Sequence, residues 1–124
     1  MHPTRPRRDP REFLPLTHLG FHILLALADE PRHGYAIVKD VRERSLDAVN
    51  PGTGSFYSVM HGLTASGLLT EVDGGDASTD ERRRYYGLTP LGRAVMAAEA
   101  NRLKALVSAA EKLVGRHTAK GGPR

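Results

Sequence analysis

The sequence contains no cysteine and no tryptophan, and aromatic residues make up only 6% of its 124 residues. The absence of cysteine excludes a disulfide framework and any thiolate metal site, and it fits a reducing compartment. Long apolar segments are also missing, since the stretch ILLALA is far too short to span a bilayer. The first thirteen residues lack the apolar segment of a secretory signal. We therefore predict a soluble, cytoplasmic protein without a membrane partner.

The motifs of common enzymes are missing as well. The sequence has no Ser/His/Asp set around a nucleophile elbow, no phosphate-binding glycine loop and no metal triad. His18 and His22 stand four residues apart, as two ligands on one helix would, but two ligands do not make a metal site. We predict no enzyme activity, no metal and no cofactor. A net charge of +4 and a pI of about 9.8 instead allow a polyanionic partner.

Three short helices are predicted in the first half of the chain. Residues 1–13 are rich in proline and arginine, which is typical of a disordered basic arm. A first helix follows Thr17, a possible N-cap, and ends at the turn DEPRHG. A second helix follows His33, which we expect to fix that turn. The third helix lies in GSFYSVMHGLTA, where Thr53 or Ser55 can cap it.

The second half of the chain changes to strand patterns and then returns to a helix. LLTEV and RRRYYGL predict two short strands around the polar turn DGGDAST, which together make a β-hairpin. Thr89 and Pro90 form a helix start, an N-cap followed by proline at the first helical position. We expect this helix to occupy residues 89–115, and residues 116–124 to be a disordered tail. The order of elements predicts a mostly α protein with a small β-hairpin, a winged helix-turn-helix over residues 14–88 followed by a long C-terminal dimerisation helix.

The third helix combines a buried stripe with an unusual exposed face. Its apolar residues recur at the three- and four-residue steps of a core stripe, namely Phe56, Val59, Met60 and Leu63. Its other face carries hydroxyls and an imidazole, which can donate to phosphate oxygens and base edges without a full charge. We predict that this face contacts DNA through Ser55, Tyr57, Ser58 and His61. The alternative is that Ser55 only caps the helix and Tyr57 packs its ring on the hairpin.

Basic residues next to the hairpin and in the arm could add phosphate contacts. Arg82, Arg83 and Arg84 lie on the returning strand, where alternation sends Arg83 to one face and its neighbours to the other. We predict that at least one of the three reaches a phosphate, although a charged edge strand that only favours solubility is the alternative. We expect Tyr85 and Tyr86 to pack rather than to stack on bases. For the arginines of the arm, a minor-groove or phosphate contact and a purely non-specific attraction both remain open.

The last helix carries the prediction about quaternary structure. Its apolar residues follow a coiled-coil-like 3-1-3-3-1 spacing, and we call them the seam: Leu103, Leu106, Val107, Ala110, Leu113 and Val114. A small winged domain cannot cover this seam in addition to its own core. An exposed apolar patch of this kind usually marks an interface, so we predict a homodimer. The alternative is that the helix folds back on the first helix of its own chain.

Three motifs of the sequence resemble the PadR-like transcriptional regulators. They are HGYAIVKDV at the second helix, GSFYSVMHGLTASGLL at the third helix, and RRRYYGLTPLGRAV at the start of the last helix. In this order and spacing they cover roughly Leu16 to Leu113. The resemblance implies a homodimeric DNA-binding repressor that often responds to a ligand.

The chain also departs from that family pattern at two places. The family often has basic residues where this chain has His61 and Gly62, so the recognition helix lacks a permanent positive charge. The predicted turn of the hairpin is acidic, and phosphate would repel its residues Asp73, Asp76 and Asp80. We therefore expect that the tip of the wing does not enter a groove of DNA.

These features together predict a transcriptional regulator. We expect a sequence-specific repressor that binds double-stranded DNA at a palindromic operator as a homodimer, and that a small-molecule effector can release. The alternative is a winged helix that only mediates protein interactions and has no specific DNA binding.

Overall fold

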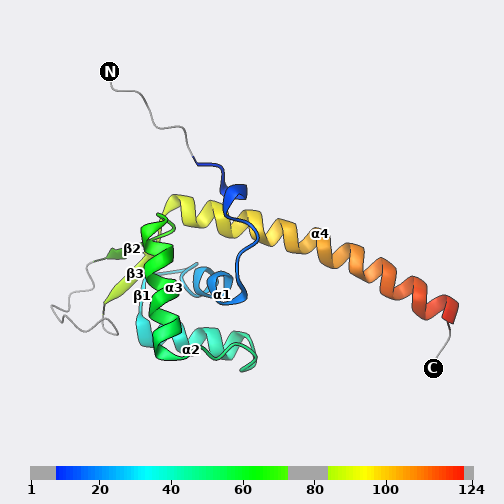
Figure 1. Ribbon diagram of the computed structural model, residues 1–124, viewed down its shortest axis with the longest axis horizontal. Coiled ribbons are helices and arrows are strands. Elements are labelled where there is room, and N and C mark those ends of the chain that lie inside the picture. Colours follow the sequence, from blue (N-terminus) through cyan, green and yellow to red (C-terminus); the bar gives the residue numbers. More distant parts are fainter. Residues whose placement is uncertain (1–7, 73–83, 122–124) are drawn as a thin grey trace, which may run out of the picture.

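The computed structural model describes residues 8–72 and 84–121, and it contains a helical winged domain followed by a long helix (Figure 1). The elements in chain order are η1 (Pro10–Phe13), α1 (His18–Ala26), β1 (Arg32–His33), α2 (Gly34–Arg44), α3 (Thr53–Ala65), β2 (Leu69–Val72), β3 (Tyr85–Leu88) and α4 (Pro90–Gly121). The predicted fold class is confirmed, with mostly helices, a small antiparallel sheet and a long C-terminal helix.

The core lies between α1, α2, α3, the sheet and the first turns of α4. Residues from each of these elements are 2% exposed or less, namely Ile23, Leu24, Leu27, Ile37, Val41, Phe56, Met60, Leu69, Tyr86 and Val95. Burying one such side chain contributes about 1.5–3 kcal/mol, so this cluster is the main stabilising feature of the winged domain. The predicted buried stripe of α3 is confirmed, because Phe56 and Met60 are buried and Val59 and Leu63 pack against the core.

Within residues 8–72 and 84–121, the sheet has three strands rather than the two of the predicted hairpin. Its order is β1-β3-β2 and both pairings are antiparallel. Arg32 pairs with Tyr86 on one side of β3, and Glu71 pairs with Tyr86 on the other. A strand of two residues has no alternation of apolar and polar side chains, so the sequence offers no periodic signal for β1.

Side chains that cap the helices fix where α1, α2 and α4 begin. The Thr17 hydroxyl accepts a hydrogen bond from the amide of Gly20 at 2.9 Å, and the Thr89 hydroxyl accepts one from the amide of Gly92 at 2.9 Å. His33 does the same for α2, because its Nδ1 accepts from the amide of Ala36 at 3.2 Å. All three predicted roles are confirmed. Such caps typically contribute about 1 kcal/mol each.

Two glycines allow the close packing between α3, β2 and α4. Gly67 has a φ of 85° and turns the chain from α3 into β2, in a region that residues with a Cβ rarely occupy. Gly92, in the first turn of α4, lies so close to the backbone carbonyl of Leu68 that a Cβ at this position would overlap it. Together they hold the first turn of α4 against the sheet.

Both ends of the chain are more ordered than predicted. The arm was expected to be disordered over residues 1–13, but Pro10–Phe13 form η1, whose first turn is capped by Asp9. The tail was expected to be disordered over residues 116–124, but α4 continues to Gly121. The residues after Val114 contain no proline before Pro123, and a single glycine costs a helix only about 1 kcal/mol. In the described part of the chain, no helix is long and apolar enough to cross a membrane.

Candidate nucleic-acid interface

The outer face of α3 carries small hydrogen-bonding side chains. Ser55, Ser58 and His61 are exposed, as are Gly54 and Gly62 on the same face. A Cβ added at either glycine would meet nothing within 4 Å, so the protein's own packing does not require glycine there. At these two glycines no side chain projects from α3, so a second molecule can approach its backbone closely. Three of the four predicted contact residues of α3 therefore lie on one exposed face.

Tyr57 lies at the border between this face and the core. It is half-buried, and its ring meets the ring of Phe56 edge-on with centroids 4.9 Å apart. The alternative that the Tyr57 ring packs on the hairpin stays a prediction, because residues 73–83 of the hairpin lie outside the described residues. Packing of this kind fixes the direction of the side chain, so a tyrosine at this border can both stabilise α3 and line its surface.

The first turn of α3 lacks a side-chain cap. The N-cap is Gly52, which has no side-chain oxygen, so the prediction that Thr53 or Ser55 caps the helix is wrong. The first amides of a helix have no acceptor within the helix, and the helix dipole adds partial positive charge at this end. Thr53, Gly54 and Ser55 are all exposed. The start of α3 is thus open to an anionic group such as a phosphate.

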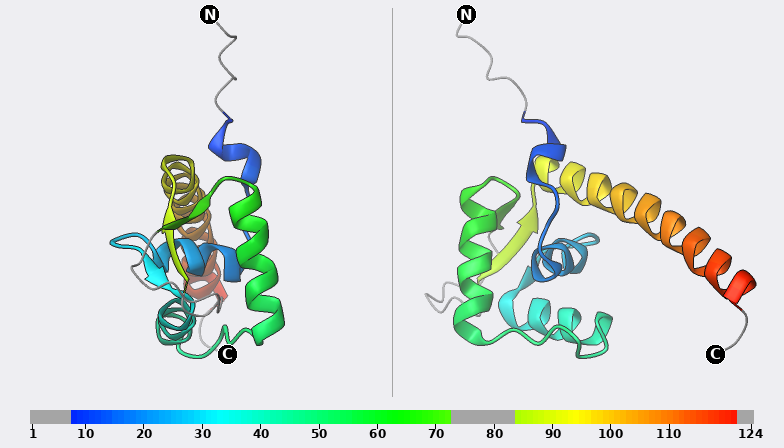
Figure 2. Two further views of the ribbon diagram at one scale, coloured as in Figure 1. Left: turned by 90° about the vertical axis from the view of Figure 1, so that its left-hand side faces the viewer. Right: turned by 45° about the vertical axis from the view of Figure 1, so that its right-hand side comes forward.

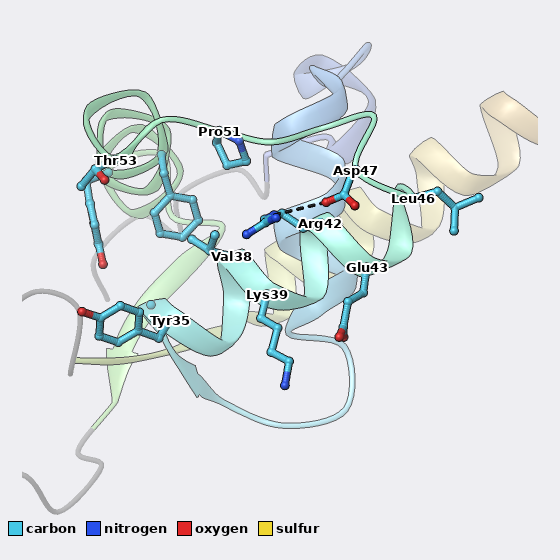
Figure 3. Close-up of a pocket in the computed structure, with 12 residues that line it drawn as sticks. Tyr35, Val38, Lys39, Arg42, Glu43, Leu46, Asp47, Pro51 and Thr53 are labelled. Atoms are coloured by element: carbon cyan, nitrogen blue, oxygen red, sulfur yellow. Dashed lines mark hydrogen bonds and ion pairs between the residues drawn. The ribbon is translucent and has the colours of Figure 1, made fainter.

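A groove of about 810 Å³ joins the start of α3 to α2 (Figure 3). Its apolar lining includes Val38, Pro51 and Phe56, and Lys39 and Arg42 project from α2 at its rim. Arg42 forms an ion pair with Asp47 at 3.3 Å, whereas Lys39 forms no ion pair with a described residue. The groove was not predicted from the sequence, because its walls come from two helices and the loop between them.

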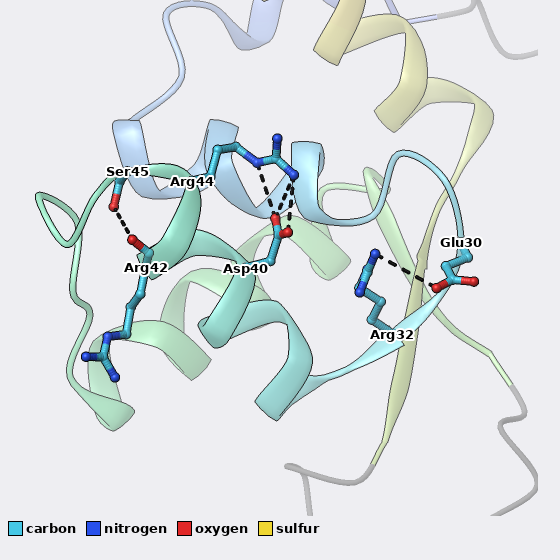
Figure 4. Close-up of polar contacts among 6 residues, drawn as sticks. All are labelled: Glu30, Arg32, Asp40, Arg42, Arg44 and Ser45. Carbon is cyan, nitrogen blue, oxygen red and sulfur yellow. Dashed lines mark hydrogen bonds and ion pairs between the residues drawn. The ribbon is translucent and has the colours of Figure 1, made fainter.

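Most arginines of the described winged domain are paired within the chain. Figure 4 shows Arg44 with Asp40 at 2.9 Å and Arg32 with Glu30 at 3.8 Å. In the same view, the Ser45 hydroxyl donates to the backbone carbonyl of Arg42 at 3.3 Å, close to the end of α2. Exposed pairs of this kind contribute little stability, but they reduce the positive charge that the domain presents to a polyanion.

Of the three arginines predicted to contact phosphate, Arg84 lies among the described residues. Arg84 lies just before β3 and its guanidinium is 3.5 Å from the carboxylate of Glu71 on β2. Arg82 and Arg83 lie outside the described residues, as does the acidic turn. Tyr86 is 2% exposed, and the Tyr85 ring packs edge-on against His33 with centroids 5.6 Å apart. The prediction that the two tyrosines pack is therefore confirmed.

The two histidines of α1 differ in their surroundings. His18 is exposed, whereas the Nδ1 atom of His22 is buried and has no hydrogen-bond partner among the described residues. Burial lowers the pKa of His22 from its ordinary value of 6.5, and the positive charge of Arg44 lowers it further. Among the described residues, no group of three or more potential metal ligands comes together.

The C-terminal half of α4 projects beyond the winged domain (Figure 1), and the predicted seam lies on it. Leu103 is half-buried and Ala110 is exposed. The four larger seam residues that follow Leu103 have high exposed fractions, 56% for Leu106, 54% for Val107, 51% for Leu113 and 65% for Val114. The prediction that the winged domain leaves this seam uncovered is confirmed. The alternative, in which the seam folds back on α1, is wrong for this half of the helix.

A buried carboxylate on α4 was missed from the sequence. Glu99 is 1% exposed, accepts a hydrogen bond from the amide of Leu16 at 2.8 Å, and pairs with Arg102. The hydrogen bond from Arg102 holds the pKa of Glu99 below its ordinary value of 4.5, although burial alone would raise it. Glu99 therefore ties the segment before α1 to α4. The sequence gives no local sign of this, since a glutamate within a helix is usually exposed.

Comparison with known proteins agrees with this arrangement of α3, a small sheet and a long last helix. The model of the Transcriptional regulator PadR-like family matches residues 23–98. The chain therefore belongs to this family of transcriptional regulators, as its motifs predicted. Members of the family are regulators rather than enzymes, and DNA binding is implied by that membership.

Solved structures share the fold at low sequence identity. A PadR family transcription regulator from Clostridium difficile R20291 has a TM-score of 0.68 and 21% identity, over 79% of this chain and 99% of that one. The RosR protein in the complex structure hsRosR-S4 has a TM-score of 0.63 and 23% identity, over 90% of this chain and 98% of that one. The PadR-like transcription factor from Bacteroides fragilis has a TM-score of 0.62 and 23% identity, over 77% of this chain and 88% of that one.

One curated relative is longer than this chain. It is the 37.1 kDa protein in transposon TN4556 of Streptomyces fradiae, which is 34% identical over 84 residues. The match covers 68% of this chain but only 22% of that relative. Protein X of Lysinibacillus sphaericus is 29% identical over 79 residues, which is 64% of this chain and 72% of that protein.

Proposed function

We propose that this protein is a homodimeric repressor that binds a palindromic DNA operator through α3. The observation that carries the proposal is the outer face of α3, where exposed Ser55, Ser58 and His61 lie between Gly54 and Gly62, two glycines that the protein's own packing does not require. Hydroxyl and imidazole groups can donate to phosphates and base edges, and small neighbours let a DNA surface come close. Tyr57 contributes from the border of this face.

The start of α3 and the wing supply the positioning contacts. The first turn of α3 has no side-chain cap, and Lys39 on the neighbouring helix forms no ion pair with a described residue, so both suit a backbone phosphate. In the wing, Arg84 can exchange its exposed pairing with Glu71 for a phosphate, and Arg82 and Arg83 extend the same basic run in the sequence. Phosphate contacts of this kind fix the register of the protein on DNA without reading its sequence.

The seam of α4 is the proposed dimer interface. Its exposed leucines and valines would be covered by the same helix of a second copy, which is the arrangement of a two-fold symmetric dimer. A two-fold dimer presents two copies of α3, so the operator should contain two inverted half-sites. Each half-site then gains from the high effective concentration that the other one creates.

Release by a small molecule forms the last part of the proposal. The groove beside α3 has apolar walls and a lysine at its rim, so a molecule with an apolar body and a negative charge could fill it. A molecule seated there would lie against the start of α3 and compete with DNA.

The test is selection of DNA from a random pool, followed by a salt titration of the selected duplex. We expect an inverted repeat, and affinity that falls linearly with salt on a log–log plot, by about 0.9 for each phosphate contact. The second function considered is a winged helix that binds only another protein. It would select no sequence, and its apolar interface would hardly respond to salt.

A further inference from the structure

The groove between α2 and the start of α3 is bordered by exposed hydrophobic side chains. Among residues 8–72 and 84–121, two large hydrophobic residues outside the seam are exposed, Tyr35 at 54% and Leu46 at 88%. Both line the groove, and Figure 3 shows them at its two ends. Figure 2 shows α2, the following loop and the start of α3 at one end of the domain, whereas α4 begins at the other. The groove is therefore separate from the place where α4 joins the core.

The backbone at Leu46 has a conformation that does not suit leucine. Leu46 has a φ of 54° and Asp47 a φ of 63°, in the left-handed region that glycine and asparagine favour. The amide of Asp47 donates to the backbone carbonyl of Arg42 at 2.8 Å. The Ser45 hydroxyl accepts a hydrogen bond from the amide of Val49 at 3.0 Å. These bonds fix the turn while the leucine side chain stays in solvent, and strained residues of this kind cluster at ligand sites.

The groove follows α2 for its whole length. Tyr35 lies in the first turn of α2 and Leu46 follows the last turn. The 11 residues of α2 span about 16 Å at the rise of an α-helix. Between the two ends, the apolar lining includes Val38, Pro51 and Phe56. An extended alkyl chain can contact all of this lining, whereas a single small ring would cover only one end of it.

The charged residues at the rim differ between the two halves of the groove. Lys39 lies towards the N-terminal end of α2 and forms no ion pair with a described residue. Glu43 and Asp47 lie in the half that ends at Leu46, and there Asp47 is paired with Arg42 at 3.3 Å. A negative head group is attracted by Lys39 and repelled by the carboxylates of the other half. The charges thus favour an anion whose apolar part points towards Leu46.

We propose that this groove binds a long-chain carboxylate, a fatty acid, with its carboxylate at Lys39 and its alkyl chain along α2 towards Leu46. This ligand is the effector of the proposed release from DNA. Its effect on DNA rests on the proposed function, whereas its binding to the protein does not. Thr53 and Phe56, at the start of α3, line the same groove, so the bound chain and a DNA backbone compete for this end of α3.

The test measures binding of fatty acids to the intact chain in the absence of DNA. Calorimetric titrations with octanoate, decanoate and dodecanoate, each below its critical micelle concentration, give the affinity as a function of chain length. We expect each added methylene group to tighten binding by up to about fourfold, the factor for burying one such group. Decanol has the chain without the charge and benzoate has the charge without the chain, so both should bind more weakly than decanoate.

Two pairs of variants locate the ligand. Leu46→Asn removes the apolar end of the groove and suits the left-handed backbone, so it should keep the melting temperature and weaken dodecanoate binding by roughly tenfold. Leu113→Asn is its control, because Leu113 is an exposed leucine on the seam. Lys39→Ala should weaken decanoate binding by up to roughly fivefold and leave decanol binding unchanged. Lys112→Ala removes an exposed lysine from α4 and should change neither.

Three results would overturn the inference. An affinity that does not rise with chain length, or benzoate that binds as tightly as dodecanoate, would exclude a long-chain ligand. An affinity that Leu113→Asn lowers and Leu46→Asn does not would place the chain on the seam. Dodecanoate that binds in the groove and leaves the operator complex intact would exclude it as the effector. None of these results bears on DNA binding itself, which the selection from a random pool tests separately.

Discussion

Two helices of this protein present surfaces that the winged domain does not cover, and the two surfaces differ in chemistry. The outer face of α3 consists of hydroxyls, an imidazole and glycines, whereas the seam of α4 consists of leucines and valines that are 51–65% exposed, together with Ala110 and Leu103. Burying apolar area is favourable against any surface that excludes water. Hydrogen-bonding groups gain only from a partner with matching donors and acceptors. The contrast supports our proposal that a second copy covers α4 and that α3 contacts DNA.

The same contrast appears within α4 itself. Its first turns are packed against the domain, with Val95 fully buried and Glu99 tied to Leu16, whereas the turns after Leu103 project from it. One continuous helix thus carries both a part of the monomer core and the proposed interface.

The largest expected effect comes from placing charge in the seam. Leu106→Glu together with Leu113→Glu would put two carboxylates into the proposed interface, where an uncompensated buried charge costs several kcal/mol. We expect a monomer in sedimentation, and operator affinity reduced by about 10²–10⁴ because the second half-site is no longer held nearby. Ala105→Glu with Ser108→Glu adds the same charge to the opposite side of the helix and should change neither. A seam variant that stays dimeric would assign the interface to another surface.

The second expected effect separates the packed half of α4 from the projecting half. Glu99→Ala leaves the amide of Leu16 without its acceptor, which should cost about 1–3 kcal/mol in the free energy of unfolding. Because the pKa of Glu99 is lowered in the folded state, its contribution is present above the ordinary value of 4.5 and is lost as pH falls through the folded pKa. The difference between the two proteins should therefore shrink in acid.

Chemical denaturation across pH measures this difference. Glu111→Ala removes an exposed carboxylate from the projecting half of the same helix, and it should leave the free energy of unfolding within about 0.5 kcal/mol. A destabilisation by Glu99→Ala that is equally large at low pH would show that the side chain stabilises by packing and not through its charge.

The sequence predicted those parts of the fold that depend on local signals. The three- and four-residue steps of Phe56 and Met60 located a buried helix face, and Thr17 and Thr89 marked helix starts that the structure confirms. The sequence did not predict the elements whose formation depends on a tertiary contact. A two-residue strand at Arg32 forms only because β3 offers it a partner, and η1 is ordered because it packs against α4.

The candidate interface was predictable to a similar degree. Exposure of Ser55, Ser58 and His61 follows from helix periodicity alone. The burial of Tyr57 against Phe56 and the anchoring of Arg8 at Ser66 depend on the directions of side chains in the folded protein, and the second contact joins residues 58 positions apart. No periodic pattern contains that information.

The third prediction tests the proposed DNA contact of the outer face of α3. Ser58→Ala and His61→Ala should each weaken operator binding by about 1–3 kcal/mol, the range for a base or charge-assisted contact. Both side chains are exposed, so the melting temperature should hardly change. His18→Ala is the matched control, because His18 is an exposed histidine on α1. Equal affinities for His61→Ala and His18→Ala would remove His61 from the interface.

The smallest expected effect compares α3 and α4 most directly, because the same substitution is made on both helices. Gly62 on α3 and Gly115 on α4 are exposed, and a Cβ added at either would meet nothing within 4 Å. Gly62→Ala and Gly115→Ala should therefore each stabilise the protein by about 0.5–1 kcal/mol, since alanine has a higher helix propensity than glycine.

If DNA lies against α3, the added methyl group of Gly62→Ala occupies space that DNA needs, so this variant should be more stable and yet bind the operator less tightly. Gly115→Ala, on the side of α4 away from the seam, should gain stability and keep its affinity. Melting curves and anisotropy titrations of the two variants give both quantities, and a Gly62→Ala protein that binds as tightly as the intact chain would place DNA further from α3 than we propose.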